Sequence, residues 1–203
     1  MNFRPITPVA FPAYGALNVN MMPFIMGDLS SVPPELLGYA PLLAACTVPE
    51  DQIGSVGYLT VDEREVVADT THRRAGLHTE GFGTDGGWGG GGWGRSGGLF
   101  VANTRPESCA LYDTNVPEGG PMGQVTPEQI AGVPPHLMPA NVLYWMHDRT
   151  PHESLPVAAG RRQFFRLVTR DVSVWYAQHN TPNRLGVQPA ARVVTGSKFQ
   201  QRD

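Results

Sequence analysis

The stretch TPHESLPVAAGRRQFFRLVTRD, residues 150–171, is the part of the chain that best indicates its fold. His152 begins a turn that contains Pro156 and leads into a run rich in aromatic and aliphatic residues. Such a run, bounded by turn residues, is typical of a β-strand. Side chains alternate along a strand, so Arg162 and Arg166 would lie on the same face. The stretch therefore predicts a strand that carries two guanidiniums close to a histidine.

The rest of the chain also favours short strands. Glycine (24 residues) and proline (19 residues) are abundant among the 203 residues, and both oppose helix interiors. Strands are expected at residues 56–67, 72–80, 98–104, 109–114, 141–148 and 172–180. Short helical turns are expected at residues 33–46 and 126–132, the second capped by Thr126. This spacing predicts a single, mainly β domain of the jelly-roll type, with a core over residues 55–178 and a Pro-rich arm, residues 1–50, packed on it.

Composition narrows the possible partners. The net charge is −3 and there is no basic stripe, so no nucleic-acid partner is expected. No apolar run approaches the ~20 residues of a membrane span, and prolines interrupt the N-terminus where a signal peptide would be apolar. We therefore expect a soluble cytoplasmic protein that acts on a small molecule or a peptide. Cys46 and Cys109 are expected to be buried free thiols rather than one bridge.

A candidate metal site comes from two separate segments. His78 and Glu80 are two residues apart, so on a strand both side chains would point the same way. Two imidazoles and one carboxylate suit Fe(II), because they leave coordination positions open. The third ligand is expected to be His152, since arginines that can bind a carboxylate follow it. His147 would face the other side of a shared strand.

Other polar residues near these ligands have less specific roles. We expect His72, His136 and His179 to lie on the surface or in turns. Asp148 and Glu153 flank the distal histidine and could orient imidazoles.

These residues resemble a known family. The string HESLPVAAGRR has the form H-x-x-x-P-V-x-x-G-x-R, and RRAGLHTEG precedes it by a long interval. The combination is similar to the Fe(II)/2-oxoglutarate-dependent oxygenases, in particular the prolyl-hydroxylase-like branch, over residues 55–178. The resemblance implies a double-stranded β-helix (jelly-roll or cupin-like) with a few flanking helices.

The resemblance also implies roles for individual residues. His78, Glu80 and His152 would bind Fe(II), and Arg162 would bind the far carboxylate of the co-substrate 2-oxoglutarate. Arg166, on the same expected face, is the alternative for that carboxylate. Glu80 stands where the family more commonly has Asp, which adds one methylene to the reach. The implied activity is that of a dioxygenase, which uses O2 to hydroxylate an unactivated C–H bond of a small molecule or an amino-acid or peptide substrate.

The glycine-rich run at residues 81–98 has two interpretations. It is either a simple connector or a lid over the iron, with Trp88 and Trp93 contacting the substrate. It lacks the G-K-[ST] ending of a phosphate-binding loop and no helix pattern follows it, so a P-loop is rejected.

Two other functions remain open at this stage. The same His/Glu/His set could hold the zinc ion of a hydrolase, which would have no use for Arg162. A non-enzymatic β-sandwich binding module would need no metal.

Overall fold

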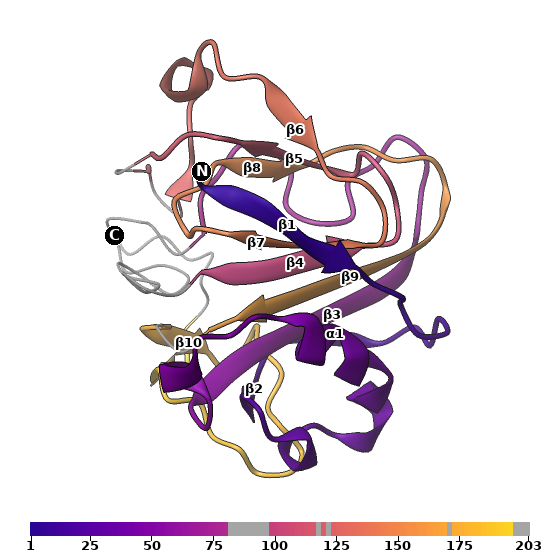
Figure 1. The fold of residues 1–203 in the computed structure, drawn as a ribbon, viewed down its shortest axis with the longest axis vertical. Helices are drawn as coiled ribbons and strands as arrows, with labels where there is room; N and C mark the ends of the chain where they lie inside the picture. The colour runs from indigo at the N-terminus through magenta and orange to yellow at the C-terminus, as the bar shows by residue number, and fades with distance from the viewer. Residues whose placement is uncertain (81–97, 117–118, 121–122, 170–171, 197–203) are drawn as a thin grey trace.

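The structure is a computed structural model that describes residues 1–80, 98–116, 119–120, 123–169 and 172–196. Its largest element is an antiparallel six-stranded sheet with the order β1-β7-β4-β9-β3-β2 (Figure 1). The strands of this sheet are β1 (Phe3–Pro8), β2 (Asn18–Ile25), β3 (Val56–Val66), β4 (Leu99–Asn103), β7 (Val142–Met146) and β9 (Gly160–Val168). A smaller antiparallel sheet contains β6 (Pro135–Leu137), β5 (Cys109–Tyr112) and β8 (His152–Ser154), and β10 (Val174–Tyr176) pairs with β11 (Arg192–Val194).

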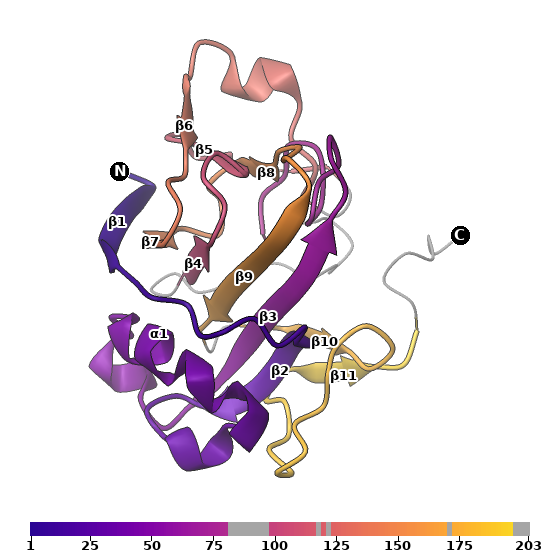
Figure 2. The same ribbon diagram turned by 90° about the vertical axis from the view of Figure 1, so that its right-hand side faces the viewer.

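The large sheet is covered on both faces. Along β9, Phe164 belongs to the core that the large sheet shares with β5, whereas Phe165 belongs to the core beneath the helical segment. This alternation follows from the two-residue period of a strand. Figure 2 shows the small sheet and the helical segment at opposite ends of the view, with β3 and β9 running between them. One face of β3 and β9 is therefore directed towards the small sheet and the other towards the helices.

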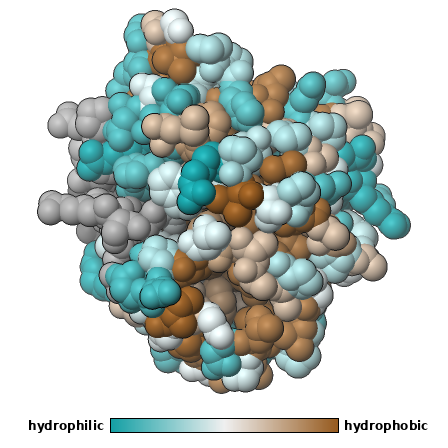
Figure 3. Space-filling view, in the orientation of Figure 1, coloured by the Kyte–Doolittle hydropathy of each residue, from teal (hydrophilic) through white to brown (hydrophobic). Residues whose placement is uncertain are grey.

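The helical segments are short. They are η1 (Leu29–Ser31), η2 (Pro34–Tyr39), α1 (Ala40–Ala45), η3 (Glu50–Gln52) and η5 (Pro127–Ile130). Thr126 and Gln129 form a capping box at the start of η5, which confirms the expected turn and its cap. Apolar surface gathers over the part of the molecule that carries α1 (Figure 3). Within the described residues, no helix has both the length and the apolar character needed to cross a bilayer.

The N-terminal residues differ from the expected arm. Within residues 1–50, β1 pairs with β7 and β2 pairs with β3, so this stretch supplies both edges of the large sheet. The helical part that follows β2 lies over a face of that sheet, and Val9 and Phe11, which precede β2, pack against the same core. The prolines did not prevent pairing, because edge strands tolerate a missing backbone donor.

Most other expectations for the chain are confirmed. Strands occur where they were expected at residues 56–67, 98–104, 109–114 and 141–148 and in the run 162–171 that follows His152, and a short strand lies within 172–180. Cys46 and Cys109 are free and buried. The strand expected at 72–80 is wrong, since among the described residues this segment makes only two isolated bridges, from His78 to Gln124 and to His152.

A buried carboxylate joins the N-terminal residues to the sheet. Glu63 on β3 accepts hydrogen bonds from the backbone N–H of Gly15 (2.6 Å) and Leu17 (3.1 Å) and from the hydroxyl of Tyr39 (2.6 Å). The amide of Gln163 on β9 donates a fourth bond at 2.9 Å. Burial alone would raise the pKa of Glu63, but these donors hold it below its ordinary value. Glu63 is therefore ionised at neutral pH and fastens the chain before β2 to the sheet.

Replacing Glu63 by Gln is expected to lower the free energy of unfolding by about 1–3 kcal/mol, because one buried donor loses its acceptor. A depressed folded-state pKa stabilises the protein above the unfolded value, near 4.5, and this contribution is lost as pH falls through the folded-state value. Chemical denaturation at several pH values should therefore show a constant difference in the free energy of unfolding between the unaltered protein and the Glu63→Gln variant above about pH 5.5. Below about pH 4.5 this difference should be smaller. Glu65→Gln, at an exposed position of the same strand, is the control. An equal loss in the control would contradict the assigned role.

Candidate metal centre

His78, Glu80 and His152 come together between the two sheets. One potential ligand atom from each lies within 4.8 Å of the others. The side chains of His152 and Glu80 are only 9% and 13% exposed. His78 is also buried. This separation matches a set of ligands around one ion, so the three residues can hold a metal ion.

Backbone pairing brings the two histidines together. The N–H of His78 donates to the carbonyl of His152 at 3.0 Å, and the N–H of His152 donates to the carbonyl of His78 at 2.9 Å. The ring centroids are 4.3 Å apart as a result. Glu80 is held by a third backbone bond, from its N–H to the carbonyl of Asp148 at 3.0 Å. Thus the segment before residue 81 is positioned by β8 and its lead-in, although it is not itself a strand.

The orientation of both imidazoles leaves one nitrogen available. Nδ1 of His78 lies 2.8 Å from the carbonyl of Gly76, and Nδ1 of His152 lies 2.9 Å from the carbonyl of Thr150. A carbonyl oxygen can only accept, so each Nδ1 carries the proton. In the neutral ring, Nε2 then keeps its lone pair for a metal ion. The Nε2 of His152 is 3.7 Å from the Glu80 carboxylate, on the shared side of the site.

The protonation states suit metal binding. Burial lowers the pKa of His78 to about 3, and the neighbouring His152 acts in the same direction. His78 is therefore neutral at physiological pH. Burial alone would raise the pKa of Glu80, but the charge of Arg166 and contact with the histidines hold it well below its usual value. The site thus offers a neutral imidazole and a carboxylate anion.

Two buried arginines on β9 lie on the same side as the site. Nη1 of Arg166 is 2.5 Å from Oε1 of Glu80, so this guanidinium contacts the acidic ligand directly. Arg162 is only 1% exposed, and its Nε and Nη1 have no hydrogen-bond partner among the described residues. Burial lowers the pKa of Arg162 to about 10, so it remains a cation at neutral pH. Arg161, the adjacent residue, is exposed, as the alternation of the strand requires.

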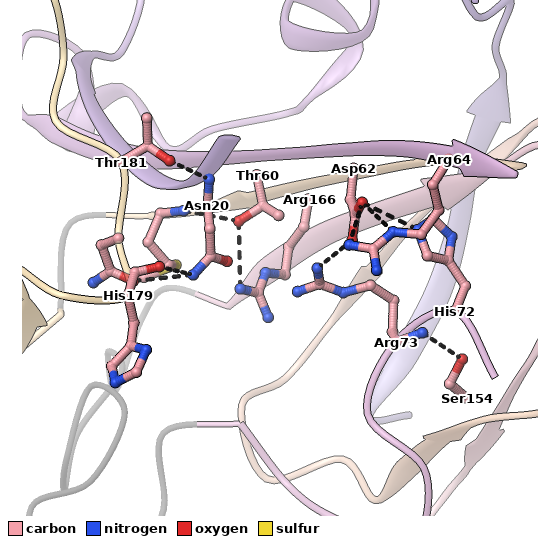
Figure 4. Close-up of polar contacts among 12 residues, drawn as sticks. Asn20, Thr60, Asp62, Arg64, His72, Arg73, Ser154, Arg166, His179 and Thr181 are labelled. Carbon is pink, nitrogen blue, oxygen red and sulfur yellow. Dashed lines mark hydrogen bonds and ion pairs between the residues drawn. The ribbon is translucent and has the colours of Figure 1, made fainter. Parts of the chain in front are cut away.

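A second buried carboxylate lies further along β3. Asp62 is fully buried and is 2.7 Å from Nη1 of Arg73 and 3.1 Å from Nε2 of His72 (Figure 4). Arg64 donates to the same carboxylate at 2.9 and 2.8 Å. Burial alone would raise the pKa of Asp62, but the hydrogen bonds from His72 and Arg73 hold it far below its usual range.

Several polar residues lie elsewhere than expected. His72 is buried against Asp62 and is not a surface residue. Asp148 pairs with His147 at 2.7 Å rather than with a ligand imidazole, and Glu153 accepts from the hydroxyl of Tyr112 at 2.8 Å. Backbone carbonyls take over the orienting role that was assigned to these acids.

The two tryptophans expected to contact substrate, Trp88 and Trp93, lie outside the described residues, as does almost all of the glycine-rich run. The connector and lid interpretations both stay predictions.

The cluster around Asp62 was not expected from the sequence. A signal was present, because Thr60, Asp62 and Arg64 are polar residues two apart in β3. Such a row on one face predicts a polar interior at that position.

A scan against protein-family models and searches among curated proteins and among solved structures found no match for this chain. The functional argument therefore rests on the geometry of the site.

Replacing His152 by Ala should lower the affinity for a divalent metal ion by more than about 100-fold, because a direct ligand has a larger effect than its outer partners. The metal content of the purified protein and a titration with Mn(II) would measure this. His147→Ala is the matched control, since His147 lies outside the group of three and should leave the stoichiometry unchanged. Unchanged metal content in the His152 variant would show that another residue is the third ligand.

Proposed function

We propose that this protein is an Fe(II)- and 2-oxoglutarate-dependent oxygenase built on a double-stranded β-helix. The observation that carries the proposal is the combination of a buried His78–Glu80–His152 group with the buried guanidinium of Arg162, two nitrogens of which have no hydrogen-bond partner among the described residues. The antiparallel strands of two sheets on either side of these residues are compatible with the proposed architecture.

The residues fit the two groups that the proposal requires. Two imidazoles with free Nε2 atoms and one carboxylate form the ligand set that suits non-haem Fe(II) with open positions. A buried cation with nitrogen donors that lack partners is a suitable receptor for a carboxylate. An arginine left in this state costs folding free energy, and a bound carboxylate would offset that cost.

Each residue then has a defined task. His78, Glu80 and His152 would hold the metal, and the carbonyls of Gly76 and Thr150 keep the imidazoles in the required tautomer. Arg162 would anchor the far carboxylate of 2-oxoglutarate, and low exposure would keep water from competing for that contact. Bound Fe(II) and 2-oxoglutarate supply the oxidising chemistry that uses O2 to hydroxylate a C–H bond.

Arg166 has a different task in this arrangement. It restrains the Glu80 carboxylate through their ion pair and keeps it ionised. This contact makes Arg166 a weaker candidate than Arg162 for the 2-oxoglutarate anchor, because its guanidinium already has an anionic partner.

The decisive experiment adds Fe(II) and 2-oxoglutarate to the metal-free protein without oxygen. The expected result is a weak visible charge-transfer band, followed on admission of air by succinate formation. Binding of zinc with no turnover of 2-oxoglutarate would instead support the hydrolase alternative. A protein that binds neither metal would support the non-enzymatic binding module.

Replacing Arg162 by Ala should raise the 2-oxoglutarate concentration needed for half-maximal succinate formation by about 30-fold or more, since loss of one partner from a buried charge pair costs at least ~2 kcal/mol. Bound iron should remain at one ion per chain. Arg161→Ala, at an exposed neighbouring position, is the control and should change neither value. If Arg166→Ala alone raises the requirement while iron is retained, the anchor is Arg166.

A further inference from the structure

Arg73 is a third guanidinium in the space beside the metal centre. Its Cζ lies 5.0 Å from the centre of the Phe164 ring, and the Cζ of Arg162 lies 5.9 Å from the same ring. Its backbone N–H points to Oγ of Ser154, at 3.4 Å, two residues beyond the ligand His152. Arg73 is therefore placed by the same two elements, β9 and β8, that carry the candidate anchor and the distal ligand.

Arg73 is held in position and remains accessible. Nη1 of Arg73 donates to Asp62 at 2.7 Å, and its side chain keeps 26% of its surface exposed, whereas the Asp62 side chain has none (Figure 4). Burial and the charge of the nearby Arg166 both lower the pKa of Arg73. A guanidinium that is held by a carboxylate on one side and is partly exposed on the other is suited to binding an anion.

Asp62 does not neutralise Arg73 by itself. The same carboxylate also accepts two hydrogen bonds from Arg64 and lies 3.1 Å from His72. One negative charge is thus shared between two guanidiniums. Asp62 orients Arg73 and leaves positive charge in the space in front of it.

The charges of the named groups at the site add up to a net positive charge when the metal and the co-substrate are included. Arg73, Arg162 and Arg166 carry three positive charges, and a divalent metal adds two more. Glu80, Asp62 and the 2-oxoglutarate dianion together carry four negative charges. One positive charge remains among these groups, and Arg64, which is more exposed, shares the Asp62 carboxylate with Arg73. Buried charge favours binding of a group that neutralises it, so a single carboxylate on the substrate would complete the balance.

We propose that the substrate is a small organic carboxylate and that Arg73, oriented by Asp62, binds its carboxylate group beside the metal centre. This inference rests on the proposed function for the charge of the co-substrate, but the contact between Arg73 and an anion does not depend on turnover. In this arrangement Arg162 binds the carboxylate of the co-substrate and Arg73 binds that of the substrate, and both guanidiniums lie near the Phe164 ring.

Acetate is the probe for this site, because it carries one carboxylate and is small enough that the shape of the site should not affect its binding. The full chain is loaded with Mn(II) and saturated with N-oxalylglycine, an unreactive analogue of 2-oxoglutarate that fills the Arg162 subsite. Bound Mn(II) broadens the methyl proton signal of acetate that exchanges into a position close to it. The expected result is that the methyl signal of acetate is broadened. The methyl signal of acetamide, which lacks the charge, should be broadened about ten-fold less or not at all.

The variants assign the effect to one residue. Arg73→Gln should weaken acetate binding about ten-fold or more with Mn(II) stoichiometry unchanged, and Arg73→Lys should restore part of it. Arg184→Gln removes the same charge at an exposed site distant in sequence and should have no effect. Equal binding of acetate and acetamide to the unaltered protein, or equal acetate binding by the Arg73→Gln variant, would overturn the proposal. The first comparison needs no variant, so it holds even if Arg73→Gln fails to fold.

A parallel titration separates this inference from the proposed function. In metal-free protein, acetate should shift the ¹⁵Nε NMR signal of Arg73. That signal is assigned as the one that is missing from the spectrum of the Arg73→Gln variant. A shift without any metal or 2-oxoglutarate binding would remove the oxygenase proposal and leave the anion site intact. Turnover of 2-oxoglutarate with no acetate shift would overturn the anion site and leave the oxygenase proposal intact.

Discussion

The reciprocal backbone hydrogen bonds between His78 and His152 are the interaction on which the candidate site depends. They join the segment after β3 to the start of β8 and set the two imidazoles 4.3 Å apart. Each ring is then turned by a carbonyl two residues before it, so that both Nε2 atoms are free. Two side chains with fixed orientation lose little further entropy when they bind a metal ion, which favours tight binding.

The second constraint is an excess of positive charge between the sheets. Arg162 is fully buried, and two of its nitrogens have no hydrogen-bond partner among the described residues. Arg73 is paired with Asp62, and Arg166 is paired with Glu80. A folded protein rarely keeps such an arrangement unless a ligand offsets its cost. The charge pattern, more than the three ligands alone, is the reason for proposing a site for anionic molecules rather than a closed structural metal site.

Agreement between sequence and structure was best where a local pattern was strong. β3, β4, β7 and β9 were recognisable because apolar and β-branched residues run between turn residues. The strand expected at 72–80 was wrong, since its residues suit a strand but, among the described residues, form only two isolated bridges, both at His78. The pairing of β1 and β2 with distant strands was also missed, because no local pattern shows which strands will be neighbours.

By itself, the sequence determined the ligand types, the two-residue spacing of His78 and Glu80, and the common face of Arg162 and Arg166, because these depend only on residue chemistry and strand period. Only the tertiary structure decided that the distal histidine meets that pair and that Asp62 lies against two guanidiniums and an imidazole. The physical reason is that burial and charge pairing depend on residues far apart in the chain, whose approach is governed by sheet register and packing rather than by local propensity.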